Sequence, residues 1–175
     1  MGGKRAFGAG LAAGFLACAL LFFIIQPALP GPETEPVFSP EDGARIPELI
    51  DSAKETVDIE IYVFSSRDVV EALERARSRG VRVRIIIERD VVGDDNDAIF
   101  RELASKGFSI RYASRAYKLT HSKFIIVDRK AVLVGSHNLS NSALYKNREA
   151  SVIIHDRRAV DEFIGAYETD WALAS

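Results

Sequence analysis

His121–Asn138, with the sequence HSKFIIVDRKAVLVGSHN, decides the fold of this chain, because it contains two short apolar runs separated by a charged turn. Both runs are rich in β-branched residues and have the length of a strand, whereas Asp-Arg-Lys between them is typical of a turn. The stretch therefore predicts two antiparallel strands, Lys123–Val127 and Ala131–Val134, joined by a hairpin.

Helical and strand patterns alternate in the sequence around this hairpin. Strand patterns occupy residues 57–63, 81–87, 108–112 and 150–154. Apolar residues at helical spacing occupy residues 46–53, 68–79, 94–107 and 159–171. This alternation predicts an α/β fold, organised as an α/β/α layered sandwich in which helices cover a mixed β-sheet.

The N-terminal part of the sequence has a different character. Residues 6–25 carry no charge, follow Lys4 and Arg5, and are long enough to cross a bilayer as a helix. We therefore expect residues 1–26 to form one transmembrane helix that gives a single-pass membrane localisation, with the remainder extracytoplasmic. A cleaved signal peptide is the alternative. Residues 27–40 are rich in proline and predict a linker, and residues 41–175 predict one folded domain.

Composition restricts the functional classes only in part. The formal net charge of −2 does not indicate a dedicated nucleic-acid binder, so any electropositive surface must be local. Cys18 is the only cysteine, which excludes a disulfide within the chain and a zinc site built from several cysteines.

Four side chains around the hairpin indicate phosphoryl transfer. His121 and Lys123 are two residues apart in a predicted strand, so they lie on the same face. Ser136 and Asn138 follow the next strand and can approach that face. An imidazole can attack phosphorus while an ammonium, an amide and a hydroxyl offset the charge on the phosphate oxygens.

The spacing of these residues along the chain is specific for one known motif. His121-x-Lys123-x4-Asp128-x6-Gly135-Ser136-x-Asn138 resembles the HKD motif of the phospholipase D superfamily. Residues 37–40 and 147–149 also resemble its short single-motif members, the bacterial Nuc-type endonucleases and the mitochondrial phospholipase D-like (Zucchini) nucleases. The resemblance covers about residues 36–173 and implies the fold and chemistry of that superfamily, without a metal ion or other cofactor.

The resemblance also implies roles for individual residues. His121 would be the nucleophile that forms a phosphohistidine, Lys123 and Asn138 would hold the phosphate oxygens with help from Ser136, and Glu149 would orient the histidine ring. The aspartate of the motif is Asp128, but its place in a turn favours a structural role.

Three further residues are candidates for substrate contact. Arg115 and Lys118 lie shortly before the motif and could border the site, although a solvated basic loop is an equally plain interpretation. His137 could stack on a base, although it occupies the variable position of the motif and a spacer role competes with this interpretation.

A single motif has a consequence for assembly. The family's chemistry uses two histidines, one as nucleophile and one as general acid, so the resemblance implies a homodimer with the active site on its two-fold axis. The preferred function is that of a nuclease acting on DNA or RNA. The alternatives are a phospholipase D or phosphatidyl transferase acting on a lipid such as cardiolipin, and an inactive anchored scaffold that binds nucleic acid.

Overall fold

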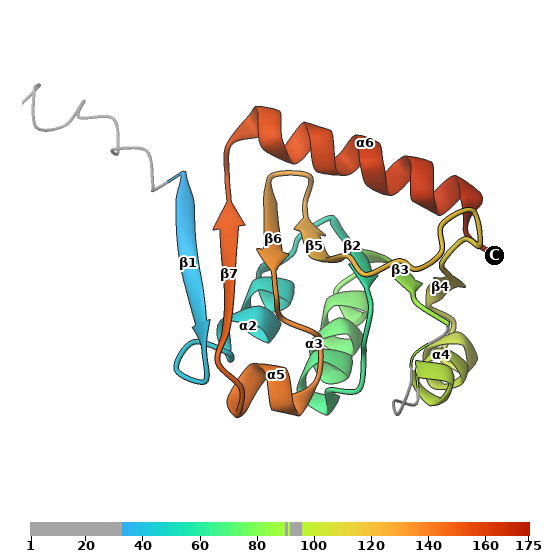
Figure 1. Cartoon of the computed structure of the whole chain (residues 1–175), viewed down its shortest axis with the longest axis horizontal. Helices are drawn as coiled ribbons and strands as arrows, with labels where there is room; N and C mark the ends of the chain where they lie inside the picture. The colour runs from blue at the N-terminus through green and yellow to red at the C-terminus, as the bar shows by residue number, and fades with distance from the viewer. Residues whose placement is uncertain (1–32, 90, 92–95) are drawn as a thin grey trace, which may run out of the picture. The chain divides into compact units, whose positions relative to one another are not determined.

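A mixed β-sheet of seven strands organises the chain (Figure 1). A computed structural model describes residues 33–89, 91 and 96–175, which fall within one unit, Pro32–Ser175. The strands are β1 (Thr34–Ser39), β2 (Thr56–Ile61), β3 (Arg82–Ile87), β4 (Ser109–Tyr112), β5 (Lys123–Val127), β6 (Ala131–Gly135) and β7 (Glu149–Ile154). They lie in the order β1-β7-β6-β5-β2-β3-β4, in which β2, β3 and β4 are parallel and the other neighbouring pairs are antiparallel.

Helices cover both faces of this sheet. They are α2 (Arg45–Ser52), α3 (Arg67–Ser78), α4 (Asn96–Ser105), α5 (Asn141–Tyr145) and α6 (Arg157–Leu173). Helices α2, α3, α4 and α5 bury apolar residues in the core on one face, and α6 buries its own on the other (Figure 1). The predicted α/β/α sandwich around a mixed sheet is therefore confirmed.

Strand β2 shows how the sheet separates the two layers. Its isoleucines and valine point into the core beneath α2 and α3, whereas the alternate residues Asp58 and Glu60 are buried on the opposite side, which α6 covers. Arg84 joins the sheet to α6 there, because its guanidinium bonds Asp58 at 2.7 Å and Glu168 at 2.8 Å. The layer beneath α6 is thus partly polar.

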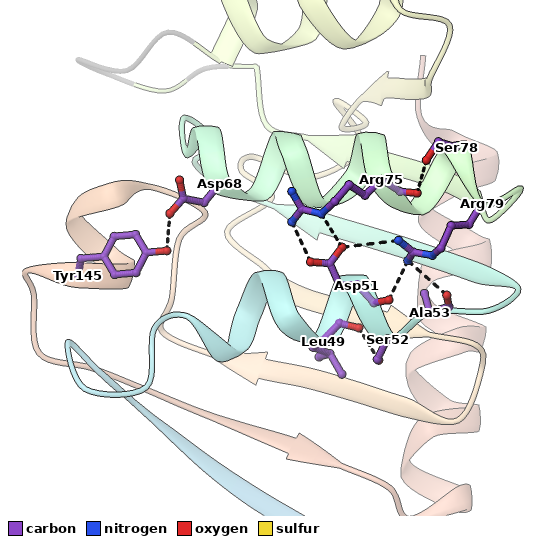
Figure 2. A network of polar contacts seen from close by, with 9 residues as sticks. All are labelled: Leu49, Asp51, Ser52, Ala53, Asp68, Arg75, Ser78, Arg79 and Tyr145. Carbon is purple, nitrogen blue, oxygen red and sulfur yellow. Dashed lines mark hydrogen bonds and ion pairs between the residues drawn. The ribbon is translucent and has the colours of Figure 1, made fainter.

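A network of ion pairs holds α2 against α3 (Figure 2). Asp51 of α2 accepts hydrogen bonds from Arg75 of α3 at 3.0 and 2.8 Å, and its backbone carbonyl accepts one from Arg79 at 2.8 Å. The Arg75 guanidinium lowers the pKa of Asp51, although partial burial opposes this. In the same figure, the hydroxyl of Tyr145 in α5 donates to Asp68 of α3 at 2.5 Å, which fixes the loop that follows β6.

Strand β1 and helix α5 are not among the elements that the sequence predicts. Residues 34–39, assigned to the proline-rich linker, instead form an edge strand that pairs with β7 in antiparallel register, Thr34 opposite Ile154 and Ser39 opposite Glu149. Pro36 is tolerated because an edge strand needs fewer ladder hydrogen bonds than a central one. The folded domain therefore begins before residue 41.

The predicted membrane localisation requires correction. Within the ranges 33–89 and 96–175 and at residue 91, no helix has both the length and the apolar character needed to cross a bilayer. The segment from which the transmembrane helix was predicted, residues 6–25, lies outside the described residues.

Candidate active site

His121 lies immediately before β5, with its imidazole at the surface. Lys123 begins β5 opposite Ile61 of β2, so the chain that leaves β2 passes beside the histidine. Tyr62, the next residue of that chain, packs its ring against the imidazole with 4.4 Å between centroids. The nucleophile predicted from the motif is therefore supported by an aromatic ring from the centre of the sheet while it remains open to solvent.

Lys123 is the second motif residue that the structure brings to this point. Its Nζ lies 3.3 Å from both ring nitrogens of His121 and 3.0 Å from the carbonyl oxygen of the same residue. Partial burial lowers the pKa of Lys123, and the negative charge of Glu149 acts in the opposite direction. This contact places the ammonium beside the imidazole, where it can also donate to an oxygen of a phosphate that the ring attacks.

Asn138 lies on the loop between β6 and α5. The amide of Leu139 donates to the carbonyl of Val63 at 2.9 Å, which ties this loop to the end of β2 beside Tyr62. The side-chain oxygen of Asn138 is buried, and the described residues offer it no hydrogen-bond partner. Asn138 therefore retains hydrogen-bonding capacity that its own chain does not use.

Ser136 and Glu149 form a pair at the adjoining ends of β6 and β7. The Ser136 hydroxyl donates to Glu149 Oε2 at 2.5 Å, and Asn147 donates to the other carboxylate oxygen at 3.1 Å. Gly135 allows this close approach, because an added Cβ would lie 2.4 Å from the backbone oxygen of Ala150. Within one chain, the carboxylate of Glu149 thus bonds Ser136 and Asn147, and its action on the His121 ring stays a prediction.

Asp128 lies at the other end of β5 from Lys123. With φ values of 51° and 56°, Asp128 and Arg129 form the type of turn that suits a two-stranded hairpin. The Asp128 carboxylate accepts hydrogen bonds from the backbone amides of Lys54, Glu55 and Thr56 at 2.7 to 3.1 Å. Burial raises the pKa of Asp128, but these three amides outweigh it and the net shift is downward.

These contacts separate Asp128 from the other motif residues. Its carboxylate fixes the start of β2, and the whole length of β5 lies between it and Lys123. Asp128 is therefore not part of the cluster around His121, and we assign it a structural role.

His137 is also removed from the site. It is only 2% exposed, and its ring nitrogens lie 2.7 Å from the hydroxyls of Ser39 in β1 and Ser151 in β7. The predicted substrate contact by His137 is therefore wrong, because the ring faces into the protein and both nitrogens are occupied. Burial lowers the pKa of His137, and the charge of Glu149 opposes this shift.

Arg115 and Lys118 lie in the exposed loop between β4 and His121. They line an open cavity of about 260 Å³, whose other lining residues are Glu88, Arg89, Ala113, Ser114 and Tyr117. Three cations thus border a small cavity shortly before the nucleophile in the chain. No group of three or more His, Cys, Asp or Glu side chains in the described ranges is arranged to hold a metal ion.

Tyr62 and Glu60 also belong to this region, although the sequence does not predict them there. The Tyr62 ring packs against His121 at an interplanar angle of 55°, and Glu60 lines a cavity of about 270 Å³ together with His121. Both residues belong to a strand-like alternation around β2, which predicts a face for each residue but not which neighbours cover that face.

Comparison with known proteins identifies the family. The model of a family described as cardiolipin synthase, PLD-like domain, matches residues 46–171, which include every residue of the cluster around His121. The chain belongs to this phospholipase D-like family. The resemblance predicted from the motif is therefore confirmed.

Individual relatives carry names of two kinds. The chain is 30% identical to a mitochondrial cardiolipin hydrolase of Mus musculus, over 81% of this chain and 65% of that protein. It is 31% identical to a phospholipase D of Rickettsia felis, over 73% of this chain and 64% of that protein. It therefore spans about two thirds of the length of these relatives. Among solved structures, the phospholipase D family member Nuc of Salmonella typhimurium aligns with a TM-score of 0.76 and 31% identity, over 83% of this chain and 97% of that one.

Proposed function

We propose that this protein is a metal-independent nuclease that cleaves phosphodiester bonds in DNA or RNA through a phosphohistidine on His121, in a homodimer with a shared active site. The observation that carries the proposal is the exposed imidazole of His121, with Tyr62 behind it and the Lys123 ammonium 3.3 Å from its ring nitrogens. In the first step the imidazole attacks phosphorus and the leaving oxygen takes a proton; in the second, water attacks the phosphohistidine and frees the imidazole.

Lys123 and Asn138 have the chemistry that this reaction needs. The Lys123 ammonium donates toward the side on which a phosphate oxygen would gain charge, and partial desolvation strengthens that interaction. Asn138 has an amide oxygen for which the described part of the chain offers no hydrogen-bond partner. The hydroxyl of Ser136 is already engaged by Glu149, so we assign Ser136 a supporting role.

The histidine inventory supports the dimer. The chain has three histidines, of which His137 is buried between β1 and β7 and His155 pairs with Glu35 at 3.0 Å. His121 is therefore the one imidazole available at the site. A two-histidine mechanism would take its general acid from a second copy of the chain, and a two-fold axis brings identical residues together.

The basic loop supports a polyanionic substrate. Arg115 and Lys118, with Arg89, border the cavity shortly before His121, where they can contact phosphates that flank the scissile one. This placement reconciles a net charge of −2 with binding to nucleic acid, because the cations are concentrated where the substrate would lie. The resemblance to Nuc of Salmonella typhimurium across 97% of that chain points in the same direction.

A phospholipid substrate is the second candidate. It is favoured by the names of the relatives, cardiolipin hydrolase and phospholipase D, since the same phosphodiester chemistry serves both substrates. A nucleic acid places nucleosides next to the scissile phosphate, whereas a phospholipid places a lipid there. Assays with both substrates separate the two candidates.

The test uses the purified full chain in excess EDTA with single-stranded DNA, duplex DNA, RNA and cardiolipin vesicles. We expect nucleic-acid cleavage that falls by roughly 10³-fold or more in His121→Ala, with acid-labile phosphate on the histidine during turnover. His155→Ala is the matched control, because it removes an exposed histidine that pairs with Glu35 away from the site. Turnover of cardiolipin alone would contradict the nuclease, and loss of activity in EDTA would contradict the metal-independent reaction.

Mixed dimers test the shared site. A heterodimer of wild type and His121→Ala has one imidazole in a shared site, so we expect its activity to fall far below half that of the wild type. Half the wild-type activity, or an active monomer by light scattering, would show that each chain carries a complete site of its own.

A further inference from the structure

A cavity of about 270 Å³ adjoins the nucleophile on the α6 side of the sheet. It is lined by Glu60 of β2, Tyr117, Leu119, Thr120, His121, Ser122 and Asp170 of α6. This volume is below that of sites for drug-sized ligands, so it suits a single planar ring system. Because His121 forms part of its wall, a group in this cavity would lie next to the scissile phosphate.

The floor of the cavity is a carboxyl group that the reaction does not use. Glu60 is 1% exposed, and among the described residues its Oε2 finds no hydrogen-bond partner. Burial raises the pKa of Glu60 to about 7; the Ser122 hydroxyl lowers it, and the nearby carboxylate of Asp170 raises it further. An unpaired buried carboxyl oxygen is costly, and a ligand with N–H donors in the cavity would satisfy it.

The mouth of the cavity has flat and apolar walls. Tyr117 is 50% exposed and Leu119 is 42% exposed, so both present accessible apolar surface beside the cavity that they line. An aromatic side chain at the rim can stack on a nucleobase, as in proteins that bind single strands. The cavity thus combines a stacking surface at its rim with acceptors at its floor.

This arrangement restricts the chemistry of the occupant. Two carboxyl groups repel a phosphate, so the phosphates of the substrate belong on the Lys123 and Arg115 sides. A carboxylate recognises a base through N–H groups on its edge. Guanine presents two such donors side by side, at N1 and N2, and therefore matches one carboxylate in a bidentate pair, whereas thymine and uracil present one.

We propose that the Glu60–Asp170 cavity is a base subsite that selects guanine at one position beside the cut. The proposal rests on the nucleic-acid function proposed above and adds a sequence preference to it. Glu60 and Asp170 accept the N–H groups of the base, and Tyr117 covers its face. The substrate would be single-stranded at this position, because the edge that pairs with the carboxylate is occupied in a duplex.

Mapping of cut sites tests the proposal. The full chain cleaves a pool of random-sequence single-stranded DNA, and sequencing of the products gives the base frequencies around each cut. We expect guanine to be enriched about fivefold or more at one fixed position. Glu60→Gln and Asp170→Asn should each reduce this enrichment toward one, because an amide offers one acceptor and a donor that clashes with the base N–H.

The matched control is Glu162→Gln. This residue is also an α6 carboxylate, but its side chain is 74% exposed and lies near Arg158, so the enrichment should stay at the wild-type value. Thermal unfolding of each variant shows whether it is folded. If Glu60→Gln fails to fold, Asp170→Asn carries the test, because Asp170 lies at the partly exposed side of the cavity.

Three outcomes overturn the proposal, and they differ in what else they affect. Cleavage of DNA with equal base frequencies at every flanking position removes the base subsite and leaves the nuclease intact. Enrichment that persists in both variants shows that guanine is read elsewhere. Hydrolysis of phosphatidylethanolamine vesicles without cleavage of DNA or RNA removes both proposals, because an ammonium head group would then be the donor that the carboxylates accept.

Discussion

Lys123 Nζ lies 3.3 Å from both ring nitrogens of His121 and 3.0 Å from its carbonyl oxygen, although the two side chains leave the backbone two residues apart. The period of a strand places both on one face, and the pairing of Lys123 with Ile61 fixes that face at the end of β2. The chemistry at this point therefore depends on the start of β5, and the hairpin end of the same strand serves the fold.

The first prediction concerns Lys123. Replacing it by Gln removes the positive charge beside the phosphate and keeps most of the side-chain volume, so kcat for cleavage should fall by about 10²–10³-fold. Stopped assays with the purified variant measure kcat, and thermal unfolding shows that the fold is retained. Lys130→Gln is the control, because Lys130 lies in the exposed turn at the other end of β5. An equal loss in both variants would mean that the site does not rely on Lys123.

The second prediction separates the fold from the chemistry at Asp128. Asp128→Gly tolerates the positive φ of 51° and removes the acceptor of three backbone amides, so the free energy of unfolding should fall by about 2–3 kcal/mol. Urea denaturation measures this change. The kcat of the folded fraction should stay that of the wild type, because the carboxylate lies away from His121.

Arg129→Gly is the matched control for Asp128. It changes the adjacent residue of the same turn, also at positive φ, but removes no acceptor of the amides that begin β2. It should therefore cost at most about 1 kcal/mol, because the ion pair that it removes, with Glu168 at 3.5 Å, is exposed. A stable, folded Asp128→Gly variant whose kcat drops as far as that of Lys123→Gln would return Asp128 to the catalytic residues.

The hairpin was predictable from the sequence, whereas the catalytic roles of His121, Lys123 and Asn138 stay predictions. Strands 123–127 and 131–135 match the prediction to within one residue, because their apolar runs and the turn between them are local signals. Lys123 begins β5 and His121 precedes it, whereas Asn138 lies on a loop whose position depends on the tie between Leu139 and Val63.

Other features depend on contacts between distant parts of the chain. Whether His137 is buried depends on β1, which pairs with β7 more than 100 residues away in sequence. Pro36 and the prolines on either side of β1 gave this segment the composition of a linker, so the strand that covers His137 was not predicted. Glu60 belongs to an alternation of apolar and charged residues that predicts a strand with one exposed face. Glu60 is buried because α6 covers that face.

The third prediction concerns the pH dependence of stability through His137. Its pKa is lowered in the folded state by burial, so below about pH 6.5 the unfolded chain binds a proton that the folded chain resists. The contribution of His137 to stability is therefore present above that pH and is lost as the pH falls through the folded pKa. Urea denaturation from pH 5 to pH 8 should show that His137→Gln flattens the acid side of the profile. A profile that His137→Gln does not alter would contradict the burial of an uncharged ring.

The fourth prediction has the opposite sign and concerns Glu60. Its folded pKa of about 7 lies above the value of 4.5 for a free glutamate, chiefly because burial disfavours the carboxylate. Between these values the unfolded chain releases a proton that the folded chain keeps, so the protein loses stability as the pH rises through 7. Glu60→Gln removes this loss, and the variant should be more stable than the wild type by up to about 3 kcal/mol at pH 8 and by little at pH 4.5.

Urea midpoints measured from pH 4.5 to pH 8 give the difference between the two proteins directly. Glu162→Gln on the exposed side of α6 is the control, and its difference from the wild type should not vary over that range. We expect the same Glu60→Gln variant to lose guanine selection in the cut-site assay. A gain in stability at high pH together with this loss of selection would identify Glu60 as a residue that serves binding and destabilises the fold. A Glu60→Gln variant that is less stable than the wild type at pH 8 would show instead that the carboxylate is well accommodated, and the cavity floor would then have no unmet acceptor to offer a base.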